Sequence, residues 1–199
     1  AENLSIEREL NVSPKDLSTI AYTSGTTGHP KGAMQSHEAV ILNGSMMSQL
    51  HMRGSDDIVV SALPCPHVYA NVLMTGMMMF GTKLVLHKTF EVETIFEAIE
   101  IHKATIFDGV PTMYMFMLNS PNLKSSNLSS LKRCYVGGQT MPVATMTAVE
   151  KEFKVPLIEL WGMTEIAGLG ATFPLFGPNK HGSIGCSIPY CELKIADVN

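Results

Sequence analysis

The sequence lacks the residue patterns that mark metal-binding and secreted proteins. Its four cysteines include no Cys-x-x-Cys pair, and its seven histidines include no His-Glu-x-x-His segment. These absences disfavour a structural zinc site and a disulfide framework. A reducing compartment fits this cysteine usage better, and we expect the protein to be cytoplasmic.

Charge is also scarce and shows no cluster of one sign. The chain of 199 residues has a formal net charge of -4 and 45% hydrophobic residues. No basic patch predicts nucleic-acid binding, and no acidic tail predicts a solvated arm. This composition is typical of a globular segment that can bury a core as one domain or two small ones.

Residues 58–82 contain no Asp, Glu, Lys or Arg, which raises the question of a membrane span. The apolar run is interrupted at Pro64, Pro66, His67, Asn71 and Gly76. No unbroken apolar stretch therefore reaches the length that a bilayer requires. We expect a buried strand followed by a buried helix, and no transmembrane segment.

The most informative stretch that is present is residues 22–32, Tyr-Thr-Ser-Gly-Thr-Thr-Gly-His-Pro-Lys-Gly. Its glycines permit positive φ and close approach to a ligand, and successive backbone N–H groups form a concavity for anionic oxygens. Lys31 adds a point charge suited to phosphate but follows Pro30, so the stretch is not a Walker loop. The alternative is an exposed linker, which would not need the lysine. We predict a phosphate-binding loop.

Strand-like and helix-like segments alternate after a polar lead-in at residues 1–18. Strands are expected at 19–22, 58–60, 83–86, 105–107, 132–136, 156–160 and 192–196, and helices at 36–51, after 67, at 91–103, 111–118 and 142–153. A loop rich in glycine and proline is expected to run to Gly185. The mostly unalternating apolar strands predict an α/β fold, a parallel sheet in α/β/α layers.

Three segments are predicted to follow strands: the phosphate loop, residues 137–139 and residues 161–165. In parallel α/β sheets, ligands bind beyond the carboxyl ends of the strands. The last segment combines an indole that could stack on a base, a threonine that could contact a phosphate, and a glutamate that could bind Mg²⁺. Taken alone, it could equally be a turn with Trp161 in the core and Glu165 in solvent.

These motifs resemble those of the AMP-forming adenylating enzymes, which include acyl-CoA synthetases. The phosphate loop matches over all eleven residues, and Trp-Gly-Met-Thr-Glu resembles the aromatic-Gly-x-Thr-Glu motif, with tryptophan replacing the usual tyrosine or phenylalanine. The resemblance implies that Lys31, Thr164 and Glu165 are catalytic and that Glu165 binds Mg²⁺. It implies nucleotide contacts from Thr23, Ser24, Gly25, Thr26, Thr27, Gly28, Lys31, Gly137, Gly138, Gln139, Trp161, Gly162, Met163 and Thr164.

The resemblance also implies an acid-binding site at His67, Gly138 and Gly162. Pro66 stands where an aromatic residue is usual, and His67 alone reads equally as a hydrogen-bonded core residue. Gln139 replaces a small residue and would narrow the site or bind a polar group. The absence of aspartate between Pro64 and Asn71 argues against an α-amino acid.

Acyl-chain length is predicted from Gly162, because acetate-activating relatives close the pocket with tryptophan directly after the stacking aromatic. Glycine leaves this position open, which favours a medium- or long-chain fatty acid or an aryl acid. The methionines at 113, 115 and 117 either border such a pocket or fill the core.

We therefore expect residues 19–199 to be the central part of the large domain of an acyl-CoA synthetase. ATP, Mg²⁺ and coenzyme A are the implied cofactors, and a homo-oligomer is compatible with the sequence. The upstream segment and the C-terminal domain of the family are absent, so we expect the isolated chain to be inactive. Two alternatives remain: a nucleotide-binding pseudo-enzyme, and an aryl-acid enzyme that loads a carrier-protein thiol.

Overall fold

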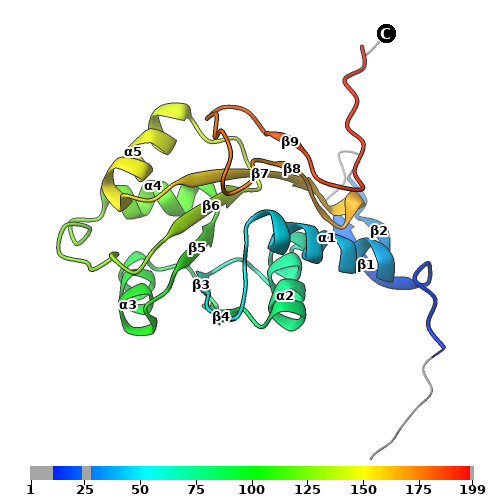
Figure 1. The fold of residues 1–199 in the computed structure, drawn as a ribbon, viewed down its shortest axis with the longest axis horizontal. Helices are drawn as coiled ribbons and strands as arrows, with labels where there is room; N and C mark the ends of the chain where they lie inside the picture. Colours follow the sequence, from blue (N-terminus) through cyan, green and yellow to red (C-terminus); the bar gives the residue numbers. More distant parts are fainter. Residues whose placement is uncertain (1–10, 24–27, 198–199) are drawn as a thin grey trace, which may run out of the picture.

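A parallel sheet forms the centre of the molecule, as the apolar strands predicted. The computed structural model describes residues 11–23 and 28–197 (Figure 1). The sheet has the order β4-β3-β5-β6-β7-β8-β9, and the first five of these strands are mutually parallel. Its strands are β3 (Ile58–Ser61), β4 (Lys83–Leu86), β5 (Ile106–Gly109), β6 (Arg133–Gly137), β7 (Leu157–Met163), β8 (Gly168–Thr172) and β9 (Cys186–Ser187).

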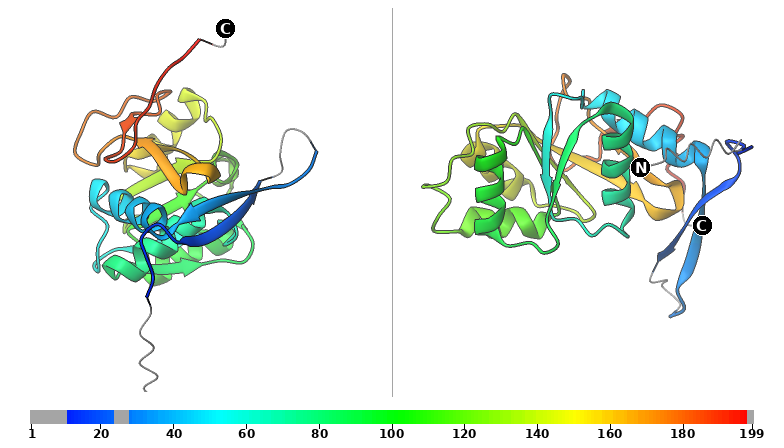
Figure 2. Two further views of the ribbon diagram at one scale, coloured as in Figure 1. Left: turned by 90° about the vertical axis from the view of Figure 1, so that its right-hand side faces the viewer. Right: turned by 90° about the horizontal axis from the view of Figure 1, so that it is seen from below.

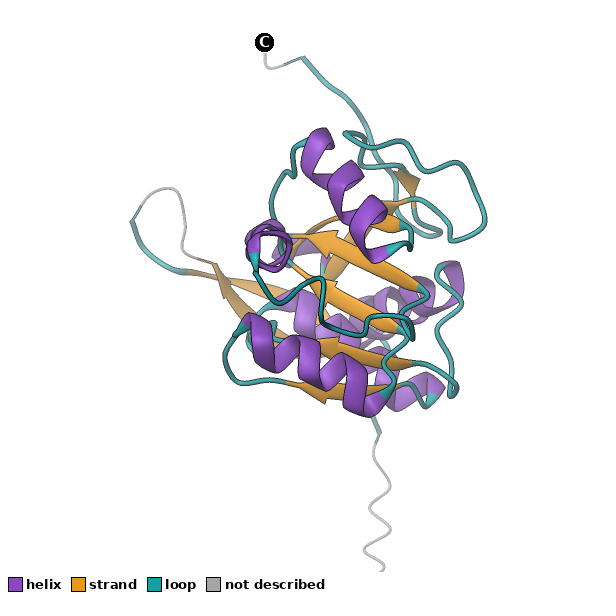
Figure 3. Cartoon of the chain, turned by 90° about the vertical axis from the view of Figure 1, so that its left-hand side faces the viewer, coloured by secondary structure: helices purple, strands orange, loops and turns teal. Residues whose placement is uncertain are grey.

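Helices cover both faces of this sheet, so the predicted α/β/α layers are confirmed (Figure 3). They are α1 (His37–Leu50), α2 (Val68–Phe80), α3 (Val92–His102), α4 (Pro111–Asn119) and α5 (Val143–Phe153). The α1 and α2 helices pack on each other, whereas α3 contacts α4 and α4 contacts α5. Among the described residues, none of these helices has both the length and the apolar character needed to cross a bilayer.

Local sequence explains where two of these helices begin. The Ser36 side chain caps α1 by accepting a hydrogen bond from the Ala39 amide, which satisfies one of the free N–H groups of the first turn. Pro111 opens α4, where its missing N–H is not needed. Only Val110 separates β5 from α4.

The strand that carries the phosphate loop is not part of the main sheet, which corrects the predicted arrangement. The β1 strand (Leu17–Thr23) pairs antiparallel with β2 (Lys31–Ser36) in a separate two-stranded sheet. Figure 2 shows this hairpin extending from the body of the molecule. The predicted phosphate loop therefore joins two hairpin strands and does not end a strand of the parallel sheet.

The C-terminal part differs from the prediction in two further ways. The expected loop before Gly185 contains a short 3₁₀ helix, η1 (Thr164–Ile166), and the buried antiparallel strand β8. The predicted strand at 192–196 is wrong, because these residues have no regular structure and Ile195 is fully exposed. The short β9 strand pairs with β8 instead.

His51 is a buried histidine whose protonation opposes folding. Its ring lies 4.4 Å from that of Tyr135, and its Nε2 lies 3.2 Å from Thr172 Oγ1. Burial, and then the nearby Arg53 and Arg133 guanidinium groups, lower the pKa of His51 below its ordinary value. The folded protein therefore holds this ring neutral, whereas the unfolded chain protonates it below about pH 6.5.

We expect the free energy of unfolding to fall as the pH drops below about 6.5, by up to about 1.4 kcal/mol per pH unit from His51. Denaturant titrations between pH 7.5 and 5.0 measure this slope. His51→Phe should reduce it, and the control His102→Gln, at an exposed position of α3, should not. Equal slopes in both variants would contradict the assignment.

Candidate functional site

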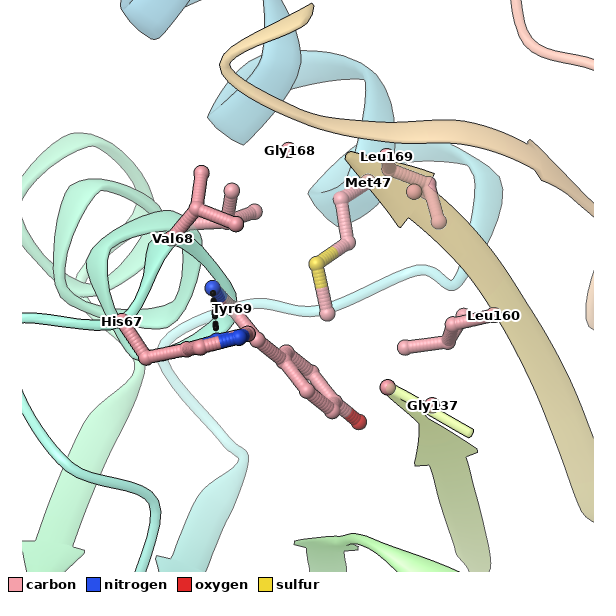
Figure 4. A pocket seen from close by; sticks show the side chains of 11 residues that line it. Met47, His67, Val68, Tyr69, Gly137, Leu160, Gly168 and Leu169 are labelled. Atoms are coloured by element: carbon pink, nitrogen blue, oxygen red, sulfur yellow. Dashed lines mark hydrogen bonds between the residues drawn. The ribbon is translucent and has the colours of Figure 1, made fainter. Parts of the chain in front are cut away.

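A narrow apolar pocket of about 50 Å³ lies at the carboxyl ends of β6 and β7 (Figure 4). Its wall consists of Met47, His67, Val68, Tyr69, Val72, Gly137, Gly138, Leu160, Gly162, Gly168 and Leu169. The three residues predicted to bind the acid, His67, Gly138 and Gly162, all lie in this wall. The structure thus brings together segments that are about 100 residues apart in the sequence.

His67 lies at the mouth of this pocket and caps α2. Its Nδ1 accepts a hydrogen bond from the Tyr69 amide at 3.1 Å, and its side chain is exposed. It is therefore not a core residue. Because Nδ1 accepts, the proton of the neutral ring is on Nε2, which can donate to a carboxylate.

Gly162 has a structural reason that is independent of acyl length. A Cβ atom at this position would overlap the carbonyl oxygen of Gly168 in the paired β8 strand. Glycine is thus required by the close approach of two backbones. The methionines at 113 and 117 are buried in the core, and none of the three predicted methionines lines the pocket. Gly162 therefore does not by itself indicate a long acyl chain.

Tyr69 connects the pocket to a buried ion pair. Its hydroxyl donates to Asp108 Oδ1 at 2.9 Å, and Arg53 donates to both carboxylate oxygens of Asp108 at 2.7 and 3.0 Å. Burial raises the pKa of the Tyr69 phenol, and Asp108 raises it further, so the hydroxyl keeps its proton and donates. Burial alone would lower the pKa of Arg53, but Asp108 raises it above the ordinary value.

A second ion pair joins Arg133, at the amino end of β6, to Asp57, directly before β3. Arg133 donates to Asp57 Oδ2 at 2.6 Å, and Thr105 donates to Asp57 Oδ1 at 2.7 Å. Burial alone would raise the pKa of Asp57, but these two hydrogen bonds and the Arg133 charge lower it overall. The Tyr135 ring links the two pairs, since Arg53 lies 4.2 Å above it and Arg133 Nε donates to its hydroxyl. These four charged residues were not predicted from the sequence to pair.

The Trp-Gly-Met-Thr-Glu motif extends β7 and then turns into η1. Thr164 and Glu165 belong to η1, and the Glu165 side chain is exposed. Gln35 of β2 is buried and donates from Nε2 to the Thr164 carbonyl oxygen at 2.7 Å. This hydrogen bond fixes the hairpin of the phosphate loop to the turn that carries Thr164 and Glu165.

The two ends of the phosphate loop are described, but its centre is not. Thr23 ends β1, Lys31 begins β2, and the two residues are register partners. Gly28 has φ +88°, a conformation that favours glycine. The Lys31 side chain is exposed and can reach a ligand in solvent. Ser24, Gly25, Thr26 and Thr27 lie outside the described residues.

Trp161 does not line the pocket that contains Gly137 and Gly138. It borders a larger hollow of about 520 Å³ between α1 and residues 188–194. The tryptophan ring packs so closely over Gly170 that a Cβ atom there would lie 2.7 Å from it. Gln139 is exposed and lines neither hollow. A shared adenine site of Trp161, Met163 and residues 137–139 therefore remains a prediction.

Comparison with known proteins identifies relatives over nearly the whole chain. The model of the AMP-binding enzyme family matches residues 2–199. A long-chain-fatty-acid–CoA ligase of Bacillus subtilis is 32% identical over 90% of this chain and 33% of its own length. An indoleacetate–CoA ligase of Aromatoleum aromaticum is 34% identical over 96% of this chain and 38% of its own length.

The fold is shared with solved structures of such enzymes. A malonyl-CoA ligase crystallised with methylmalonyl-CoA and AMP has a TM-score of 0.83 and 26% identity, covering 92% of this chain and 40% of that protein. The chain spans about a third of the length of the curated relatives that it matches. The chain belongs to the family of AMP-binding enzymes.

Proposed function

We propose that this chain is the ATP-binding central part of an acid–thiol ligase that makes an acyl-CoA. In the first step, a carboxylate oxygen attacks the α-phosphorus of ATP, giving an acyl-adenylate and pyrophosphate. In the second step, the sulfur of coenzyme A attacks the acyl carbon and AMP leaves. The first step depends mainly on positioning and charge stabilisation.

The observation that supports this proposal most directly is the hydrogen bond from Gln35 to the Thr164 carbonyl. It joins β2, which begins with Lys31, to the turn of Thr164 and Glu165. We assign Lys31 to the departing pyrophosphate and Thr164 to the α-phosphate. The conformational freedom of Gly28 and the exposed ammonium group of Lys31 suit an anionic ligand.

A magnesium ion fits this turn. Glu165, whose carboxylate is exposed, is the next residue after Thr164 in η1. Mg²⁺ prefers one or two carboxylates together with phosphate oxygens and water. The described residues contain no group of three or more His, Cys, Asp or Glu side chains that could hold a metal alone. When bound, the ion would neutralise charge on the phosphates; Glu165 would hold it, and Lys31 would contact the departing pyrophosphate.

We assign the acid to the pocket beside His67, whose Nε2–H can donate to the carboxylate. The sequence alone favoured a medium- or long-chain fatty acid. The names of the relatives include a long-chain fatty acid, indoleacetate and 2-succinylbenzoate, so the family does not select one acid.

The four cysteines are free thiols, which fits the reducing cytoplasm that we propose as the location of the protein.

Carboxylate-dependent ATP–pyrophosphate exchange tests the function, using the complete protein that carries this chain. The acid panel runs from acetate through butanoate, octanoate and dodecanoate to benzoate and indoleacetate. Exchange with at least one acid, followed by acyl-CoA formation, supports the proposal. Mg·ATP binding without exchange for any acid would instead favour the nucleotide-binding pseudo-enzyme.

The hydrogen bond between hairpin and turn should matter for this exchange. Gln35→Leu leaves the Thr164 carbonyl without its buried partner, at a cost of about 1–3 kcal/mol. We expect the exchange rate to fall about five- to hundredfold, because the position of Lys31 relative to Thr164 is then no longer fixed by this hydrogen bond. Gln49→Leu, at an exposed position of α1, is the matched control. Equal rates in the two variants would contradict the role of Gln35.

A further inference from the structure

We infer that Asp108 and Arg53 are positioning residues that hold Tyr69 in the wall of the acid pocket, so that the site takes a compact acid. This inference rests on the proposed function, because it assigns the acyl group to this pocket. Asp108 and Arg53 set a size limit for the acyl group without touching the substrate.

Tyr69 is one of the side chains that line the pocket. It lies in the first turn of α2, and only 9% of it is exposed. Its ring points from α2 toward the end of β6, where it packs against Gly137 (Figure 4). A Cβ atom on Gly137 would lie 3.3 Å from Tyr69 Cε1 and 3.0 Å from the Leu160 carbonyl oxygen. The ring therefore bridges the gap between helix and sheet.

The Tyr69 hydroxyl is held from the side away from the pocket. Asp108, at the end of β5, is fully buried and accepts the phenolic hydrogen bond at Oδ1. Arg53 fixes that carboxylate through two parallel hydrogen bonds, and its own guanidinium lies over the Tyr135 ring. Bidentate, charge-assisted pairs of this kind restrict orientation as well as distance. The carboxylate therefore presents Oδ1 to Tyr69 in one position.

The restrained ring limits the space for the acyl group. The pocket measures about 50 Å³, which corresponds to about four water-sized groups. A longer chain would require the Tyr69 ring to turn away from Gly137. That movement would leave Asp108 without one of its buried hydrogen bonds, which is unfavourable. Asp108 and Arg53 thus act as a clamp on Tyr69, and this clamp opposes the opening that a long acyl chain would need.

The test is the acyl-length profile of exchange in the complete protein. For the wild type, we expect kcat/KM to fall at least about a hundredfold from butanoate to octanoate. Tyr69→Phe keeps the ring but removes its restraint, and should reduce this fall about tenfold, mainly through the KM for octanoate. Asp108→Leu should act in the same direction. Asp108→Asn, which keeps an oxygen acceptor, should lie closer to the wild type.

Tyr114→Phe is the matched control. Tyr114 is a fully buried tyrosine whose hydroxyl donates to two backbone carbonyls, and it does not line the pocket. Its substitution removes a buried hydroxyl in the same way and should leave the ratio between the two acids unchanged. A purely structural role of Tyr69 would give the same result as this control.

Each outcome is informative. A wild-type preference for octanoate or dodecanoate over butanoate overturns the size limit, although the proposed function stands. An unchanged ratio in Tyr69→Phe and Asp108→Leu overturns the clamp. Binding of Mg·ATP without exchange for any acid overturns the proposed function itself, and the inference falls with it.

Discussion

Replacing Asp108 by leucine is expected to lower the free energy of unfolding by about 3–5 kcal/mol. The substitution leaves the buried Arg53 guanidinium without its counter-charge and the Tyr69 hydroxyl without its acceptor. Neither group can turn to solvent, because the Arg53 side chain is only 4% exposed and Tyr69 only 9%. Urea unfolding at pH 7.5 measures the loss, and an unchanged m-value would show that the unfolded state is the same.

Removing all three partners together should cost much less than the sum of the single changes. In Arg53→Met/Asp108→Leu/Tyr69→Phe, no charge or hydroxyl of this group remains buried, and buried ion pairs replaced by apolar residues are often neutral in stability. Asp56→Leu, next to the second ion pair but exposed, should change stability by less than about 0.5 kcal/mol. An equal loss for Asp108→Leu and Asp56→Leu would contradict the buried pair.

Strands that are buried on both faces were predictable from sequence because they appear as continuous apolar runs, without the alternation of apolar and polar residues seen in half-buried strands. The β5 and β6 strands are buried throughout, as expected for parallel strands that are covered by helices on both faces. Helix starts at Ser36 and Pro111 were equally predictable, because capping depends on the residues of one turn. The parallel sheet and its layers followed from these local signals.

The antiparallel edge was not predictable in the same way. The β8 strand, Gly-Leu-Gly-Ala-Thr, has small residues where a strand is usually identified by branched or aromatic ones. Gly170 leaves room for the Trp161 ring of β7, and Gly168 leaves room for Val72 of α2 and Asn43 of α1, so the need for these glycines depends on elements that pack against the strand. Residues 192–196 were wrongly predicted as a strand. Their composition is strand-like, but among the described residues no strand pairs with them.

Buried charges were missed for a related reason. Arg53 and Asp108 are 55 residues apart, and each alone reads as an ordinary surface charge or turn residue. One signal was present, since Asp108 directly follows the apolar Ile106-Phe107 at the end of the strand expected at 105–107. A charge inside a buried strand requires a partner, but the identity of the partner depends on the fold. The three residues predicted for the acid site came from local glycine and histidine motifs, and His67, Gly138 and Gly162 line one pocket.

Lys31→Ala is expected to lower carboxylate-dependent ATP–pyrophosphate exchange by about a hundred- to a thousandfold in the complete protein. The loss follows from removing one fixed charge at the departing pyrophosphate, and single electrostatic groups of this kind contribute about 3–4 kcal/mol to catalysis. Lys31 is exposed and takes part in no ion pair among the described residues, so its substitution should leave the unfolding midpoint nearly unchanged.

Lys83→Ala is the matched control for this prediction. Both lysines are exposed and open a strand, Lys31 in β2 and Lys83 in β4, but β4 lies at the far edge of the sheet. A loss of exchange in Lys31→Ala alone assigns the effect to the phosphate loop and not to general surface charge. Equal exchange in both variants would remove Lys31 from the reaction. Thr164 and Glu165 would then have to stabilise the phosphates without the hairpin, and the Gln35 hydrogen bond would be only structural.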